Sequence, residues 1–215
     1  MISTAKYLIT ETNANVAYTQ SDEITLGWNI TNPDSEFLFN GKTFKLLSTL
    51  SAITSVFFNK KLKNYIPEKS HLMPTFDCRI FNVPNTQELV NAVYWRELDA
   101  IKNSITMAAR CYYSDADLFK KNSSDKLEML LYKGVDWNDF PTYFKRGTYI
   151  LRKKVSSKFS DADLNNLPLK HNARKFPDLE IERWERNIVD LPPLSQIKNK
   201  AHNHLLMHNK LLLIL

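Results

Sequence analysis

Two short segments near the start of the chain have the residue pattern of β-strands, Val16–Thr19 and Ile24–Trp28. The residues between them, Gln20-Ser21-Asp22-Glu23, are typical of a turn. The pattern therefore predicts a β-hairpin with two carboxylates at its tip. Carboxylate oxygens in such a position can bind a hard divalent cation.

Helical spacing of apolar residues predicts helices at Ser3–Thr10 and Lys42–Asn59. The apolar stripe of the second helix is expected to comprise Phe44, Leu47, Leu50, Ile53 and Phe57. A longer helix is predicted from Asn85 or Thr86, as N-cap, to about Tyr112. Its expected core-facing stripe contains Val90, Tyr94, Leu98, Ile101, Ile105, Ala108 and Tyr112.

Three polar residues of this long helix, Arg96, Asp99 and Asn103, fall on the side opposite the apolar stripe. They would present a cation, an anion and an amide next to one another. The alternative interpretation is an ordinary solvated helix face with a local ion pair.

The remaining elements are short. Strands are predicted at Phe76–Val83, Gly147–Val155 and Leu179–Val189, and a helix at Lys126–Leu131. Asn32–Ser35 reads as a loop. The tail after Lys198 has a helical composition.

The composition is that of a folded protein with an excess of positive charge. The formal net charge is +6, and basic residues cluster at 60–63, 152–158 and 170–175. This excess suits an anionic partner, although charge alone does not distinguish RNA from a membrane surface or from solubility. Only Cys78 and Cys111 are present, which predicts free thiols in a reducing cytoplasm. No segment is long and apolar enough to predict a membrane span.

Several common kinds of active site are not indicated. Four glycines leave no glycine-rich phosphate loop, and no Gly-x-Ser-x-Gly motif supports a serine hydrolase. His202, His204 and His208 could form a metal cluster, but no Cys or carboxylate completes it at a matching spacing. A solvated tail is the favoured interpretation of these histidines.

The hairpin residues form an ordered series with three later blocks, Phe76-Asp77-Cys78-Arg79, Trp95–Asp99 with Asn103, and Lys126–Leu130. In this order the blocks resemble the tRNA-histidine guanylyltransferase family, which adds nucleotides to the 5′ end of tRNA. The resemblance covers about residues 1–198. It implies an α+β fold with a polymerase-palm-like antiparallel sheet backed by helices and a C-terminal αβ extension. It also implies an enzyme that uses magnesium, with GTP and ATP as substrates.

The resemblance also implies roles for individual residues. Asp22 and Glu23 would be catalytic metal ligands, and Ser21 would contact a nucleotide triphosphate. Further nucleotide contacts are expected from Lys42, Lys45 and Asn103. Positions linked to activity or tRNA contact are Arg96, Asp99, Lys126, Asn138 and the basic run Arg152, Lys153 and Lys154.

One departure from the family pattern concerns the start of the chain. Family members begin with a strand that ends in an Asp-Gly-Arg motif, whose aspartate is another metal ligand, and residue 1 aligns after that motif. We therefore expect an N-terminally incomplete palm at residues 1–132, an αβ region at 133–198 and a tail at 199–215. The alternative to an enzyme is a non-catalytic tRNA-binding or oligomerisation module. A cyclase-like or nuclease-like palm enzyme is disfavoured by the Trp95–Asn103 block. Expected partners are tRNA, nucleoside triphosphates and further copies in a tetramer or dimer, without a membrane.

Overall fold

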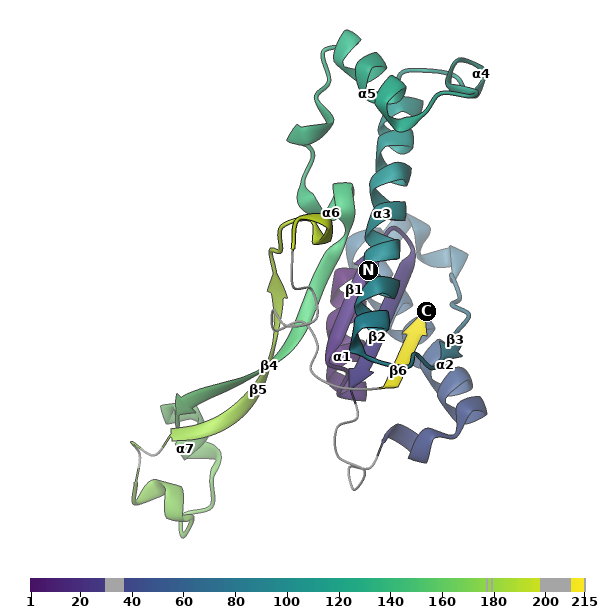
Figure 1. Cartoon of the computed structure of the whole chain (residues 1–215). Helices are drawn as coiled ribbons and strands as arrows, with labels where there is room; N and C mark the ends of the chain where they lie inside the picture. The colour runs from purple at the N-terminus through teal and green to yellow at the C-terminus, as the bar shows by residue number, and fades with distance from the viewer. Residues whose placement is uncertain (30–36, 177, 179, 198–209, 215) are drawn as a thin grey trace.

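The computed structural model describes residues 1–29, 37–176, 178, 180–197 and 210–214. Its centre is a six-stranded sheet with the order β3-β6-β2-β1-β4-β5 (Figure 1). Every neighbouring pair is antiparallel. The strands are β1 (Val16–Gln20), β2 (Glu23–Asn29), β3 (Arg79–Phe81), β4 (Thr148–Lys158), β5 (Glu180–Val189) and β6 (Lys210–Ile214).

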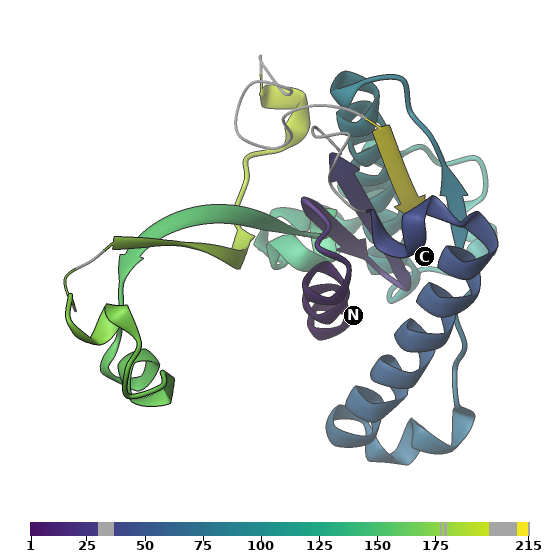
Figure 2. The same ribbon diagram turned by 90° about the horizontal axis from the view of Figure 1, so that it is seen from below.

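Helices cover both faces of this sheet (Figures 1 and 2). The α-helices are α1 (Ile2–Thr12), α2 (Thr43–Tyr65), α3 (Thr86–Arg110), α4 (Asp115–Leu118), α5 (Ser123–Tyr132), α6 (Thr142–Arg146) and α7 (Asp161–Asn166). Short 3-10 turns are η1 (Leu38–Gly41), η2 (Pro67–Leu72), η3 (Trp137–Asp139), η4 (Asn172–Arg174) and η5 (Leu194–Gln196). The expected α+β class, with an antiparallel sheet backed by helices, is confirmed.

Strand β1 is buried on both of its faces. Ala17 packs with α1 and α2 in one apolar cluster, whereas Val16 and Tyr18 pack under α3 in another. This division follows from the two-residue period of a strand, which sends successive side chains to opposite faces. Each large apolar side chain buried in this way contributes about 1.5–3 kcal/mol relative to an exposed one. The hairpin that carries the predicted site therefore grows out of the centre of the core.

Helix α3 spans the second face and extends beyond the sheet towards α4 and α5 (Figure 1). It begins where predicted, because the Asn85 side chain accepts a hydrogen bond of 2.9 Å from the Glu88 backbone N–H. The expected stripe is partly wrong. Val90, Ile105 and Ala108 are buried, but Tyr112 lies past the helix end and is exposed.

A charged residue on the buried face of α3 was not predicted. Glu97 is fully buried, and its two carboxylate oxygens accept hydrogen bonds from the Tyr149 hydroxyl at 2.7 Å and the Leu194 backbone N–H at 2.8 Å. The carboxylate thus joins α3 to β4 and to the turn η5. Burial is the main cause, and the nearby Glu97 carboxylate the second, of a pKa of Tyr149 that lies above its ordinary value. The hydroxyl therefore keeps its proton and can donate it to the hydrogen bond.

Two other expectations are corrected. In α2 the core positions are Leu46, Leu50 and Thr54, and Phe44 is 88% exposed. The predicted stripe began two residues too early, because the apolar residues of this helix do not follow a single clean period. Phe76–Val83 is extended, but only Arg79–Phe81 pairs as a strand.

The tail contributes a strand of the sheet. Residues 210–214 form β6 between β2 and β3, so the helical expectation for these residues is wrong. The histidines of the tail, the predicted loop at 32–35 and Leu179 lie outside the described residues.

Strands β4 and β5 form a long arm that leaves the body and ends near α7 (Figures 1 and 2). Residues 148–151 of β4 also pair with β1, while within the described chain residues 152–158 pair with β5 alone. The proposed boundary at residue 132 stays a prediction. The two regions that it separates share one sheet through the pairing of β1 with β4.

The first prediction tests the two sides of α3. Ile105→Ala removes a buried side chain and should lower the free energy of unfolding by roughly 2–5 kcal/mol. Asn103→Ala removes an exposed amide that donates a 3.0 Å hydrogen bond to Asp99. It should change the free energy of unfolding by no more than about 0.5 kcal/mol. Chemical denaturation measures both values, and equal changes would show that the helix faces are assigned wrongly.

The second prediction concerns Gly147, which precedes β4 with φ of 78°. An added Cβ would lie 2.7 Å from both the Thr19 carbonyl oxygen and the Tyr18 hydroxyl. Gly134 has a similar φ of 74° and open space around its Cα, so it is the matched control. Gly134→Ala should cost about 1–2 kcal/mol of stability from backbone strain alone. Gly147→Ala should cost about 1–3 kcal/mol more, from overpacking and from its backbone (ψ of −167°), which almost only glycine adopts; thermal unfolding measures both losses. The same loss in both variants would contradict the close packing.

Candidate functional site

The acidic tip of the β1–β2 hairpin is held by its own backbone and side chains. Pairing of the strands ends at Gln20 and Glu23, so Ser21 and Asp22 form a two-residue turn. Ser21 has φ of 49°, a left-handed conformation that few non-glycine residues adopt. The Thr19 hydroxyl donates a 2.9 Å hydrogen bond to the Glu23 carbonyl oxygen. The predicted hairpin is therefore confirmed, with both carboxylates at its end.

The two carboxylates have different surroundings. Glu23 is half-buried and forms an ion pair with Arg96 at 3.2 Å, and the Gln20 amide donates to the same carboxylate oxygen at 3.3 Å. Asp22 is exposed and forms no ion pair with the other described residues. Glu23 is therefore fixed in position, and Asp22 is accessible to a ligand.

A cavity of about 440 Å³ opens beside this tip. Its wall contains the carboxylates of Asp22, Glu23 and Asp77 and the guanidinium groups of Arg79 and Arg96. Carboxylates bind hard cations, and arginine matches the geometry of phosphate oxygens. The acidic cavity, as we call this space, therefore offers groups for both a metal ion and a polyphosphate.

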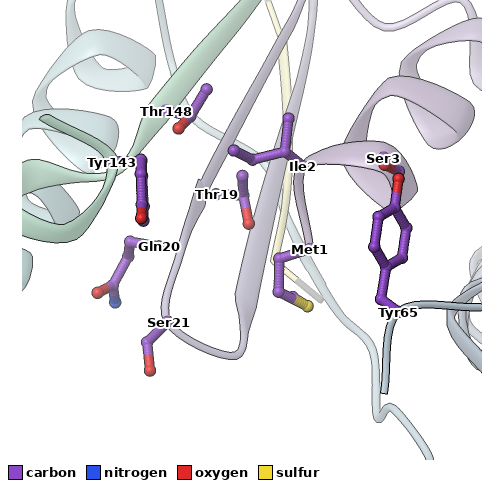
Figure 3. A pocket seen from close by; sticks show the side chains of 9 residues that line it. All are labelled: Met1, Ile2, Ser3, Thr19, Gln20, Ser21, Tyr65, Tyr143 and Thr148. Carbon is purple, nitrogen blue, oxygen red and sulfur yellow. The ribbon is translucent and has the colours of Figure 1, made fainter. Parts of the chain in front are cut away.

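A second cavity of about 420 Å³ shares Met1 and Ser21 with the acidic cavity and extends along β1 to Thr148 of β4 (Figure 3). Figure 3 shows Gln20 beside Tyr143, and Tyr65 near Ser3 across the opening. Both tyrosines are largely exposed. Such aromatic rings provide stacking surfaces for a nucleobase, and the neighbouring hydroxyl and amide groups can hydrogen bond to its edge.

The structure brings some of the predicted site residues together. Ser21 and Asn103 line one further cavity of about 240 Å³ with Tyr143, and Arg96 reaches Glu23. Asp99 lies next to Asn103 on the exposed face and accepts its amide hydrogen bond. The predicted three-residue ridge is thus divided, because Arg96 turns to the hairpin and the other two residues pair with each other.

Lys42 and Lys45 are not brought to the hairpin tip. They lie at the start of α2, whereas Phe58, further along this helix, lines the acidic cavity. At 1.5 Å per residue the separation along the helix axis is roughly 20 Å. The Lys45 ammonium instead lies 4.8 Å from the centre of the Phe39 ring.

The other predicted residues lie further from the tip and have local partners. Lys126 donates to the Thr106 hydroxyl at 3.0 Å, and Asn138 donates to Asp136 at 2.9 Å. On the arm, the Arg152 guanidinium stacks 4.1 Å from the Trp184 ring centre. Lys154 forms an ion pair with Glu182, and Lys153 is exposed.

Some residues of the site had little or no signal in the sequence. Glu97 could have been found, because it continues the spacing of the buried residues Val93 and Ala100. Asp77 was visible only as part of a motif, and its approach to the hairpin depends on the fold. Tyr143 lies in a short helix far along the chain, and only the tertiary structure places it beside Gln20.

Comparisons with known proteins agree with this architecture. Residues 1–84 match the sequence profile of the family described as tRNAHis guanylyltransferase. An uncharacterized protein of Acanthamoeba polyphaga mimivirus is 29% identical over 180 residues, which cover 73% of this chain and 62% of that protein. A probable tRNA(His) guanylyltransferase of Drosophila melanogaster is 26% identical over 65% of this chain. The chain spans about half the length of this fly relative, 51%.

Solved structures show the same fold. A bacterial tRNA(His) guanylyltransferase-like protein in complex with ATP superposes with a TM-score of 0.69 at 28% identity. The superposition covers 94% of this chain and 76% of that protein. A bacterial tRNA(His) guanylyltransferase-like protein in complex with GTP gives a TM-score of 0.61 at 25% identity over the same shares. Together, the sequence and structure matches agree with the resemblance of this chain to the tRNA(His) guanylyltransferase family.

Proposed function

We propose that the chain carries a metal-dependent nucleotidyltransferase site that adds GMP, or templated nucleotides, to the 5′ end of a tRNA in the 3′-to-5′ direction. The observation that supports it best is the acidic cavity, where Asp22 and Glu23 at a rigid hairpin tip face Arg79 and Arg96. Relatives named tRNA(His) guanylyltransferase, and related proteins in complex with ATP and GTP, agree with this proposal.

The residues present fit magnesium. Within the described part of the chain no group of three or more His, Cys, Asp and Glu side chains forms a closed cage. Magnesium does not need one, because it is bound through one or two carboxylates, waters and substrate phosphates. Asp22 and Glu23 would hold the ion, which when bound supplies positive charge to the phosphoryl oxygens.

Arg96 has two tasks in this proposal. In the structure its guanidinium holds Glu23 in place and offsets the negative charge of the tip. The pair is partly exposed, and such pairs contribute only about 0–1 kcal/mol. If Glu23 held a metal ion, the guanidinium could therefore bind a triphosphate oxygen in place of the carboxylate at little cost.

Two nucleotides can be accommodated in the two cavities at the hairpin tip. We assign the triphosphate of GTP or ATP to the acidic cavity and a nucleobase to the tyrosine-lined cavity of Figure 3. Ser21 lines both cavities, so its hydroxyl can donate to a ligand in either one. The backbone turn that it occupies is fixed, which reduces the entropy lost on binding.

The tRNA is proposed to follow the basic residues of the arm. Arg152, Lys153 and Lys154 lie where β4 leaves the body. The ion pair of Lys154 with Glu182 offsets part of this charge, whereas Arg152 stacks on the uncharged Trp184 ring and keeps its charge. Assembly into a tetramer or dimer, and a cytoplasmic location, remain predictions of the resemblance and of the two free cysteines. No helix of the described residues is long and apolar enough to cross a membrane.

The third prediction tests the metal ligand. Asp22→Asn keeps the size of the side chain and removes its charge, so Mg²⁺-dependent addition of GMP to a 5′-labelled tRNA should fall at least roughly 100-fold. Asp139→Asn, at another exposed aspartate, is the matched control and should act at the parental rate. If Asp22→Asn were as active as the parental protein, Asp22 would not be a ligand of the metal ion. Parental protein that binds tRNA but never extends it would favour the non-catalytic tRNA-binding module.

The fourth prediction concerns tRNA binding by the arm. Reversing Arg152, Lys153 and Lys154 to Glu should weaken binding of every tRNA alike, because phosphate contacts carry little sequence information. For each phosphate contact that is lost, the slope of log binding constant against log salt concentration should become less negative by about 0.7–0.9. Reversal of Lys120, Lys121 and Lys133 beyond the far end of α3 changes the net charge equally and should leave the slope unchanged. Filter binding at three salt concentrations measures these slopes. An arm variant with the parental slope would show that the RNA does not contact the arm.

A further inference from the structure

The two sides of the acidic cavity belong to strands that do not pair with each other. Asp22 and Glu23 lie at the start of β2, and Asp77 and Arg79 lie at the start of β3. Strand β6 lies between these strands and pairs with both. Neighbouring strands are about 4.8 Å apart, so β6 holds β2 and β3 at roughly twice that distance.

The register of β6 aligns the two acidic segments. Ile214 is opposite Thr25 on one side and Arg79 on the other. Glu23 is two residues before Thr25, and Asp77 is two residues before Arg79. Because β6 is antiparallel to both neighbours, β2 and β3 run in the same direction and begin at the same end of the sheet (Figure 1). The carboxylates therefore meet at the mouth of one cavity.

A second anchor holds the chain just before β3. The Phe76 backbone N–H donates to the Ser55 hydroxyl at 2.9 Å, and the Asn59 amide donates to the Pro74 carbonyl oxygen at 2.8 Å. These contacts fix residues 74–76 on α2. Within the described residues, strand pairing of 79–81 comes from β6 alone. Asp77 thus lies between an anchor on α2 and an anchor on β6.

We propose that the C-terminal strand β6 is a positioning element for the acidic cavity, and that its pairing and the binding of Mg²⁺–nucleoside triphosphate there reinforce each other. The identity of the ligand rests on the proposed function, whereas the positioning rests on the strand register. A ligand that bridges Glu23 and Arg79 stabilises the spacing that β6 imposes, and by linkage β6 strengthens binding of that ligand. If β6 slipped by two residues against one of these strands and kept its register with the other, one carboxylate segment would move about 6.6 Å relative to the other.

The test interrupts β6 and measures the geometry and the binding separately. Leu212 is opposite Gly27 on β2 and Phe81 on β3, so its N–H faces one of these strands. Leu212→Pro removes that donor from a strand with neighbours on both sides, and Leu212→Val is the control that keeps it. Nitroxide labels at Ser21→Cys and Thr75→Cys, in a background with Cys78→Ser and Cys111→Ser, report the width of the cavity mouth without ligand.

We expect a narrow distance distribution for the parental protein and Leu212→Val, and a broad or shifted one for Leu212→Pro. Calorimetry on the unlabelled chains should show at least a tenfold weaker affinity of Leu212→Pro for Mg²⁺–GTP. An unchanged distribution, or unchanged affinity, would overturn the proposal. A parental chain that does not bind Mg²⁺–GTP, together with the expected distances, would contradict the proposed function and leave the positioning role standing.

If Leu212→Pro does not fold, a cross-link tests whether β6 pairs with β3 in the assigned register. Ile80 and Leu213 are opposite each other in the register, so Ile80→Cys with Leu213→Cys should oxidise to a disulfide within one chain and retain Mg²⁺–GTP binding. Leu211→Cys is two residues out of register with Ile80→Cys, about 6.6 Å along the strand, and should not cross-link efficiently. Equal oxidation of the two pairs, or a disulfide formed only between chains, would overturn the assigned register.

Discussion

The arrangement of the molecule depends on the burial of strand β1 on both faces and along both edges. Helices α1 and α2 cover one face, α3 covers the other, and β2 and β4 pair with its two edges. A strand enclosed in this way cannot shift by one residue without exchanging its two sets of side chains between different cores. Since the acidic turn directly follows β1, the register of this strand fixes the position of Ser21, Asp22 and Glu23.

The Glu97 carboxylate connects this core to the surface around the site. It accepts hydrogen bonds from β4 and η5, and the neighbouring residue on α3, Arg96, reaches out to Glu23. A buried carboxylate that loses one of its donors leaves a polar group without compensation, which costs more than the hydrogen bond itself contributes. The orientation of α3 is thereby fixed at the turn from which Arg96 approaches the hairpin.

The sequence predicted the parts of the fold that depend on local pattern. The hairpin, α3 with its Asn85 cap and the arm strands β4 and β5 were visible in periodicity and capping residues. Strand β6 was not, because five apolar residues at a chain end suit a helix or a strand equally, and the slot between β2 and β3 decides between them. Similarly, Asp77 and Tyr143 reach the hairpin through tertiary packing, for which a single sequence contains no local signal.

The arm has a mechanical consequence. Beyond Leu151 it is a ribbon of two strands, without a third strand or a helix layer along most of its length to resist bending (Figure 2). Residues 152–158 extend it by roughly 23 Å at 3.3 Å per residue. A rotation of about 10° at its base therefore displaces the far end by about 4 Å, close to the spacing of neighbouring strands. By this geometry the arm is a lever, in which a small bend at the base would move α7 by several ångströms.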